Sequence, residues 1–268
     1  MMKLNKAFAA GRLQTDCIDG IGTILIDNPQ RKNAITLSMW RAIPEAIHFL
    51  VADAKARVIV LSGAGGTDFS AGADISEFNE VRHDAETALA YETANSAAFE
   101  ALRSARVPVI AAIRGICYGG GFGLAAACDL RIADDTAGFC IPAARLGLAY
   151  PADAVLDLVN GLGSQLARVA LFTGRPVPAA NLLRQGFLSE IVSGDTLDEA
   201  ALILARQIAE NAPLSIQAAK LALRAAELSD GELLGEAAVT GAMTFESADY
   251  AEGRAAFAAR RRPNFTGL

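Results

Sequence analysis

The chain of 268 residues contains only two histidines, His48 and His83, and no H-E-x-x-H motif. Its cysteines have no C-x-x-C spacing, so nothing in the sequence predicts a metal site. No uninterrupted run of about eighteen apolar residues occurs, which argues against a membrane-spanning helix. The sequence also lacks an excess of positive charge. With 24 Lys and Arg against 30 Asp and Glu, its net charge of −6 argues against nucleic acid as the main partner.

Secretion is also not indicated. The N-terminal residues carry two lysines but only a few apolar residues before Arg12, which does not match a signal peptide. The cysteines are Cys17, Cys117, Cys128 and Cys140. Because they lie in apolar surroundings, we expect reduced thiols in the core of a cytoplasmic protein.

Glycine and small apolar residues are abundant, and they gather between residues 107 and 135. An apolar strand is predicted at 109–113, then three glycines at 119–121, a helix at 122–128 and a strand at 130–133. Glycines at this position remove every β-carbon where a ligand could approach. They also leave the first N–H groups of the helix unpaired, which favours an anion or an oxyanion.

Three interpretations of this glycine cluster compete. The first is simply tight packing of a strand against a helix. The second is a dinucleotide-binding motif, since Gly121, Gly123 and Ala126 fit G-x-G-x-x-A. Only about seven residues separate these glycines from the next strand, too few for the usual crossover helix. The third is an oxyanion hole, which needs a second N–H donor from elsewhere in the chain.

A second segment of the same design precedes it by about fifty residues. An apolar strand is predicted at 58–62, followed by Gly63, Gly65 and Gly66, and then by S-A-G-A-D leading into a helix. Two strand–glycine–helix units could each direct one backbone N–H at the same oxygen.

These segments together carry a resemblance to a known family. They are S-A-G-A-D-I at 70–75, V-P-V-I-A-A-I-R-G at 107–115 and G-G-G-F-G-L-A-A-A-C-D-L-R-I-A at 119–133. The likeness extends from L-I-D-N-P-Q-R-K-N-A-I at 25–35 to E-S-A-D-Y-A-E-G-R-A-A-F-A-A-R-R-R-P-N-F at 246–265. In combination and order they resemble the crotonase (enoyl-CoA hydratase/isomerase) superfamily.

The resemblance implies an α/β fold with a crotonase-like ββα spiral core over residues 1–195. It also implies a helical C-terminal oligomerisation region over 196–268, forming a homotrimer or a dimer of trimers. The substrate would be an acyl-CoA thioester whose enolate is stabilised by the N–H groups of Ala73 and Gly120. No cofactor is implied beyond the coenzyme A of the substrate.

The same resemblance implies a set of residues along the acyl-CoA. They are Lys32, Ala34, Ala71, Asp74, Ile75, Tyr118, Gly119, Gly123, Ala143, Phe257 and Arg260. Phe257 and Arg260 would reach the adenine and phosphate groups, often those bound to a neighbouring subunit. Simpler interpretations stay open: the Arg31-Lys32 pair as a solvated turn, Asp74 as a helix-start charge, and the C-terminal arginines as solvated cations.

The chain departs from the family at two positions. Hydratases of this superfamily carry one glutamate in G-G-G-x-E and one in P-E-x-x-L-G, and these positions are Gly123 and Ala143 here. A two-glutamate hydration mechanism is therefore excluded, so that hydration is slow or the reaction differs. The alternative is an acyl-CoA-binding protein without catalysis. We expect the missing side chains to leave room in the pocket.

Asp153 is the first candidate for the remaining proton transfer, because the superfamily places alternative acids after Leu-Gly-Leu. Weaker candidates are Tyr150, Tyr118, Cys140 and Asp74. The competing interpretation of Asp153 is the N-cap of a helix at 154–160.

Overall fold

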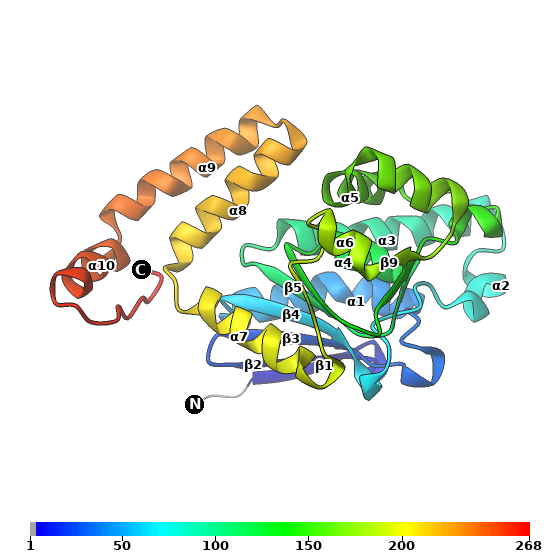
Figure 1. Cartoon of the computed structure of the whole chain (residues 1–268), viewed down its shortest axis with the longest axis horizontal. Helices are drawn as coiled ribbons and strands as arrows, with labels where there is room; N and C mark the ends of the chain where they lie inside the picture. The colour runs from blue at the N-terminus through cyan, green and yellow to red at the C-terminus, as the bar shows by residue number, and fades with distance from the viewer. Residues whose placement is uncertain (1–3) are drawn as a thin grey trace.

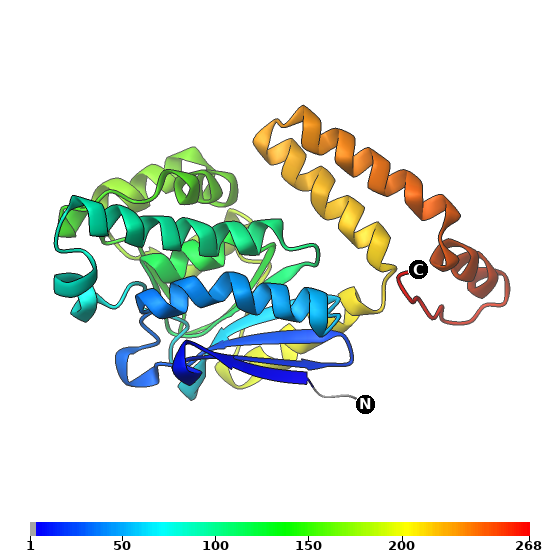
Figure 2. The ribbon, with the colours of Figure 1, turned by 180° about the vertical axis from the view of Figure 1, so that it is seen from behind.

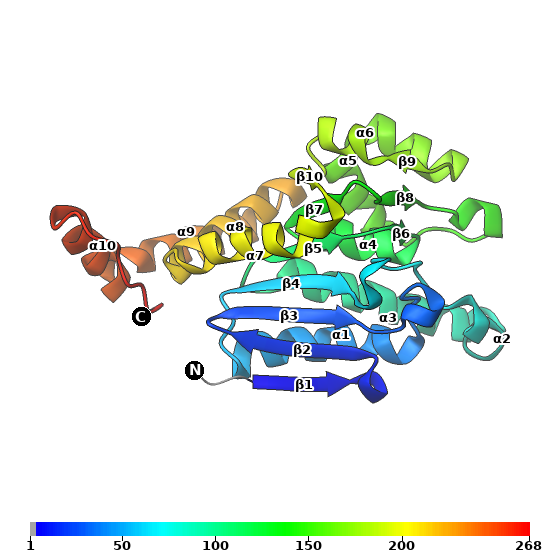
Figure 3. The same ribbon diagram turned by 60° about the horizontal axis from the view of Figure 1, so that its bottom comes forward.

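The computed structural model describes residues 4–268, and a mixed sheet of seven strands lies at its centre. In spatial order the strands are β1 (Leu4–Phe8), β2 (Leu13–Ile18), β3 (Ile21–Ile26), β4 (Val58–Gly63), β5 (Val109–Ile113), β7 (Leu130–Asp134) and β10 (Glu190–Val192). The first three pair antiparallel, and every pair from β3 onward is parallel. A smaller sheet holds β6 (Ile116–Tyr118), β8 (Gly138–Cys140) and β9 (Val177–Pro178) (Figure 3).

Helices cover both faces of the large sheet (Figures 1 and 2). They are α1 (Leu37–His48), α2 (Phe78–Val81), α3 (Ala85–Ser104), α4 (Gly120–Ala127), α5 (Ala152–Thr173), α6 (Ala179–Arg184), α7 (Leu197–Ala209), α8 (Pro213–Leu228), α9 (Gly231–Met243) and α10 (Ala248–Ala258). None of the helices within the described residues is long and apolar enough to cross a membrane.

The apolar residues of β4 show why both faces need cover. Ile59 and Leu61 lie in the main core with α1 and α3, whereas Val58 and Val60 pack in a second core with α7. Successive side chains of a strand point to opposite faces, so a continuous apolar run is buried on both sides. The mixed sheet with helices on both faces confirms the predicted α/β class.

The predicted elements differ from the structure at several ends. The strand at 109–113 is correct to the residue. The helical pattern from 75 to 106 is broken, because a 3₁₀ turn and the short α2 precede α3. The helix predicted at 154–160 is much longer, and the last helix ends at Ala258 rather than at Pro263. The hairpin predicted within 18–27 begins earlier, with β2, and turns at Asp19 and Gly20.

The four cysteines are free and buried, as predicted. Burial raises the pKa of all four thiols above the ordinary value. None of them is therefore a ready nucleophile at neutral pH.

Helices α8 to α10 form an arm that extends away from the sheet (Figure 1). The arm exposes several large apolar side chains, namely Leu223, Leu234, Val239, Met243, Phe245 and Phe257. At its base, Arg57 donates to the carbonyl of Ala209 at 3.1 Å and to that of Phe265 at 2.7 Å. The first helix after the predicted boundary at 195/196, α7, packs on the sheet, and the boundary itself stays a prediction.

Candidate active site

The loop that leads from β4 to α2 runs between two other segments of the chain. On one side, Ile35 donates its N–H to the carbonyl of Gly72 at 2.7 Å and accepts from the N–H of Asp74 at 2.9 Å. On the other side, the N–H of Tyr118 donates to the carbonyl of Ser70 at 2.9 Å. Backbone hydrogen bonds thus hold together the two glycine-rich units that the sequence predicts.

Ala73 and Gly120 face each other across these two units. Because Ile35 bonds to the residues before and after Ala73, the N–H of Ala73 itself points to the opposite side. A β-carbon built on Gly120 would lie 3.7 Å from the Ala73 nitrogen. The two nitrogens are therefore within about 6 Å of each other. Within residues 4–268, neither N–H has a hydrogen-bond partner.

Glycine is required where the two units approach. A β-carbon on Gly72 would lie 2.7 Å from the carbonyl oxygen of Tyr118 and 2.8 Å from the Gly120 nitrogen. A β-carbon on Gly120 would lie 2.8 Å from the Trp40 ring. That ring is fully buried, and its Nε1 donates to the hydroxyl of Tyr91 at 3.0 Å. Gly120 therefore faces a rigid wall, so that a side chain there has no easy escape.

Gly119 forms the turn into α4 and has φ 50° and ψ −119°, a conformation that favours glycine. Its N–H donates to the carbonyl of Cys140 at 2.8 Å. Its carbonyl accepts from the N–H of Gly123 at 3.1 Å and from the hydroxyl of Tyr150 at 2.9 Å.

The space expected beside Gly123 is occupied. A β-carbon there would lie 2.7 Å from both the Phe99 ring and the Tyr150 hydroxyl. The expectation of extra room is therefore wrong at this position, because neighbouring aromatic side chains fill it. Ala143 opens a short 3₁₀ turn (Ala143–Leu146) and packs, partly buried, against the main core.

Asp153 lies inside the first turn of α5 and is not its N-cap, which is Pro151. The capping expectation is thus wrong, because the helix begins two residues earlier than predicted. The carboxylate accepts from the Ser96 hydroxyl at 3.0 Å and from the Arg103 guanidinium at 2.7 Å. Burial raises the pKa of Asp153, but the hydrogen bonds from Arg103 and Ser96 outweigh it, so the pKa falls below the ordinary value.

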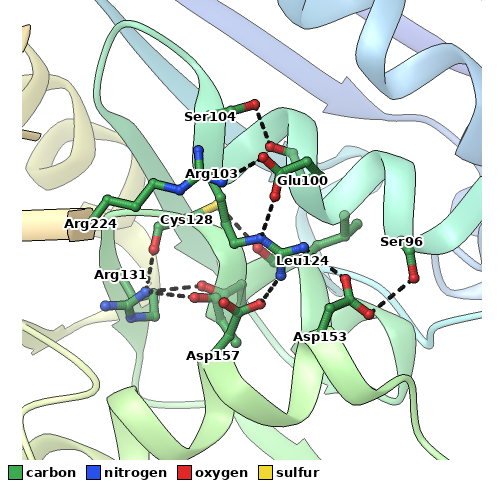
Figure 4. Close-up of polar contacts among 12 residues, drawn as sticks. Ser96, Glu100, Arg103, Ser104, Leu124, Cys128, Arg131, Asp153, Asp157 and Arg224 are labelled. Atoms are coloured by element: carbon green, nitrogen blue, oxygen red, sulfur yellow. Dashed lines mark hydrogen bonds and ion pairs between the residues drawn. The ribbon is translucent and has the colours of Figure 1, made fainter. Parts of the chain in front are cut away.

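Asp157 follows one turn later and shares the same cation, at 2.5 Å from Arg103 (Figure 4). Its side chain is only 11% exposed, and burial raises its pKa to about 6, more than Arg103 lowers it. The sequence interpretation missed this residue. Two carboxylates spaced i and i+4 on one helix were the available signal. The pair borders an open cleft of about 600 Å³ between α4, α5 and α8.

The residues predicted to line coenzyme A near the hole differ in how far they are exposed. Lys32 is exposed, and its carbonyl accepts from the N–H of Ala71, while the neighbouring Ala34 is buried. Ile75 is 58% exposed beside the hole. The buried Asp74 carboxylate caps the turn after it, accepting from the N–H and the hydroxyl of Ser76.

Two predicted contacts lie elsewhere. Phe257 is 88% exposed on α10, and Arg260 follows it. Figure 3 shows α10 at the end of the molecule opposite to α2, far from the loop that carries Ala73. A single chain therefore does not bring Phe257 and Arg260 to the candidate hole.

Comparisons with known proteins confirm the predicted crotonase-like core. The family profile described as Enoyl-CoA hydratase/isomerase matches residues 16–268. Carnitinyl-CoA dehydratase of Proteus mirabilis is 36% identical over 250 residues, which cover 91% of this chain and 94% of the relative. The mitochondrial enoyl-CoA hydratase domain-containing protein 3 of Rattus norvegicus is 31% identical over 253 residues, which cover 91% of this chain and 81% of the relative. The crystal structure of an enoyl-CoA hydratase/carnithine racemase from Magnetospirillum magneticum has a TM-score of 0.88 and 33% identity, and the match covers 96% of each chain.

Proposed function

Because the chain belongs to the enoyl-CoA hydratase/isomerase family, we propose that it binds an acyl-CoA thioester and stabilises its enolate. Ala73 and Gly120 donate their N–H groups to the thioester oxygen. The observation that carries this proposal is that the two nitrogens lie within about 6 Å of each other and that neither N–H has a partner among residues 4–268. Each such donor contributes about 10²–10³ to the rate, because negative charge develops on that oxygen in the transition state.

The rest of the substrate lies along the surface next to the hole. The contacts proposed there are Lys32, Ala34, Ala71, Asp74, Ile75, Tyr118, Gly119 and Ala143. Gly123 is left out of this set, because it is buried against Phe99 and Tyr150. Phe257 and Arg260 contribute from a neighbouring subunit of a homotrimer or a dimer of trimers. The exposed apolar side chains of the arm support such an assembly. A cytoplasmic location remains part of the proposal, supported by the four unpaired thiols.

Asp153 is the proposed proton-transferring residue in place of the missing glutamates. Its lowered pKa keeps it ionised at neutral pH, so that it accepts a proton from the substrate or from water rather than donating one. Two positioned carboxylates normally divide these tasks. Because this chain has no carboxylate at position 123 or at position 143, hydration is slow or is replaced by another reaction of the enolate.

A non-catalytic acyl-CoA-binding protein is the second candidate. It is favoured by the engagement of Asp153 with Arg103 and Ser96, which occupies the one carboxylate proposed for chemistry. Crotonyl-CoA turnover measured beside binding of acetoacetyl-CoA separates the two. Binding with measurable turnover supports the enzyme, and binding without turnover of any acyl-CoA supports the second candidate. Failure to bind either thioester contradicts both, and hydration above about 10³ s⁻¹ contradicts the slow reaction.

A further inference from the structure

The hydroxyl of Tyr150 contacts the peptide group that contains one of the two candidate donors. It donates to the carbonyl oxygen of Gly119 at 2.9 Å. That oxygen and the N–H of Gly120 belong to the same planar peptide unit and point in opposite directions. A hydrogen bond that fixes the oxygen therefore also fixes the direction of the N–H.

This peptide unit has few other restraints. It precedes the first turn of α4, and Gly119 has no β-carbon to limit its backbone. Besides Tyr150, its oxygen accepts only from the N–H of Gly123, at 3.1 Å, among the residues described. The hydroxyl is thus one of two groups that hold the carbonyl side.

The glycine at 123 leaves the room that the Tyr150 hydroxyl occupies. A β-carbon at 123 would lie 2.7 Å from the Tyr150 hydroxyl and 2.7 Å from the Phe99 ring. Burial raises the pKa of Tyr150 well above its ordinary value, so the hydroxyl keeps its proton and remains a donor at neutral pH. Since that proton is engaged with Gly119, Tyr150 is placed to orient a peptide, not to transfer a proton.

We propose that Tyr150 is a positioning residue for the oxyanion hole. Its hydroxyl aligns the peptide between Gly119 and Gly120 and polarises it, so that the Gly120 N–H becomes a stronger and better directed donor. The absence of a side chain at 123 admits the hydroxyl to this place. The inference rests on the proposed function, because it requires a thioester oxygen between Ala73 and Gly120.

The test compares Tyr150→Phe with Tyr250→Phe in the full chain. Tyr250 lies on α10, is 48% exposed, and its hydroxyl has no hydrogen bond among the residues described. Both variants are titrated with acetoacetyl-CoA and with free coenzyme A, which has no thioester oxygen. Loss of one aligned hydrogen bond should weaken acetoacetyl-CoA binding by about threefold to tenfold in Tyr150→Phe. Coenzyme A binding should not change, and Tyr250→Phe should match the wild type in both titrations.

The infrared frequency of a ¹³C-labelled thioester carbonyl reports the hydrogen bonds to its oxygen. A substitution at Tyr150 that affects only packing leaves this frequency unchanged. In the wild type, binding should lower this frequency, and Tyr150→Phe should lose part of that shift. Replacing Tyr150 by 3-fluorotyrosine, a more acidic phenol, keeps the packing and should enlarge the shift, even if Tyr150→Phe fails to fold.

The outcomes separate the two proposals. A wild type that binds the thioester and shifts its carbonyl, with an identical shift in the Tyr150 variants, overturns the role of Tyr150 alone. A wild type that binds acetoacetyl-CoA no better than coenzyme A, with no carbonyl shift, overturns the proposed oxyanion hole and the inference with it.

Discussion

Two regions near α4 are built from different chemical groups. At the N-terminal end of the helix, the candidate hole consists of backbone N–H groups and glycines held by other backbone groups. Between α3 and α5, charged side chains make the contacts, with Arg103 bonded to both Asp153 and Asp157. Backbone groups do not titrate, whereas the two carboxylates do. The first region therefore presents N–H donors that do not change with pH, and the second makes the chain sensitive to pH.

The largest effect is expected from Gly120→Ala, which tests the backbone region. The added β-carbon meets the buried Trp40 ring and must displace the N–H or the wall behind it. Loss of one hole donor should reduce turnover by about 10²–10³ and weaken acetoacetyl-CoA binding, with coenzyme A binding retained. Gly194→Ala is the control, since its nearest contact is at 3.4 Å. Equal activity of the two variants contradicts the role of Gly120.

Asp153→Asn tests the charged region and should reduce turnover by about 10², because Asn cannot accept the proton. The amide still accepts a hydrogen bond from Ser96, so the local structure is retained. Asp157→Asn is the matched control, since Asp157 bonds to the same Arg103 one turn later. Full activity of Asp153→Asn on the substrate that the wild type turns over would leave Asp153 with a structural role only.

Tyr91→Phe examines the wall behind the hole. It should lower the free energy of unfolding by about 1–3 kcal/mol, because the Trp40 N–H is left buried without an acceptor. Denaturation in urea measures the change, and Tyr250→Phe should stay within about 0.5 kcal/mol of the wild type. A Tyr91→Phe chain as stable as the wild type would mean that the indole finds another partner.

The smallest effect concerns pH and the two carboxylates. Burial raises the folded-state pKa of Asp157 from the ordinary 3.8 to about 6. Between these two values the folded chain binds more protons than the unfolded chain, so its stability falls as the pH rises from about 4 to about 6. Asp157→Asn should remove this loss, and its Tm should gain about 2–4 °C on the wild type as the pH rises. Asp153, with a lowered pKa, should act in the opposite sense and lose its stabilising contribution at acid pH. A Tm difference for Asp157→Asn that does not change with pH contradicts the raised pKa.

The sequence predicts an element best where the element's own residues show which of its faces are buried. Strand β5 was predicted to the residue, because its apolar run is buried on both faces. The strands β6 and β8 were missed, because each has three residues and exists only through its pairing partner. The start of α4 was placed at residue 122 instead of 120, since glycines weaken every helix signal.

The candidate site was predictable only in part for the same reason. Ala73 and Gly120 follow from the glycine pattern and the family resemblance, both local in sequence. Tyr150 acts on Gly119, 31 residues away, and the Arg103 partner of Asp153 is 50 residues away. Spacing within a motif carries no information about such pairs, because the packing of α5 against α3 and α4 brings them together.

The contact of Arg57 with the arm has a mechanical consequence. Ala209 and Phe265 flank the arm in sequence, so one guanidinium ties both of its ends to the edge of β4. The arm therefore cannot rotate about Ala209 or Phe265 without breaking a charge-assisted hydrogen bond to Arg57. The exposed apolar surface of the arm is thus held in one direction relative to the sheet, and if a partner binds there, little orientational entropy remains to be lost.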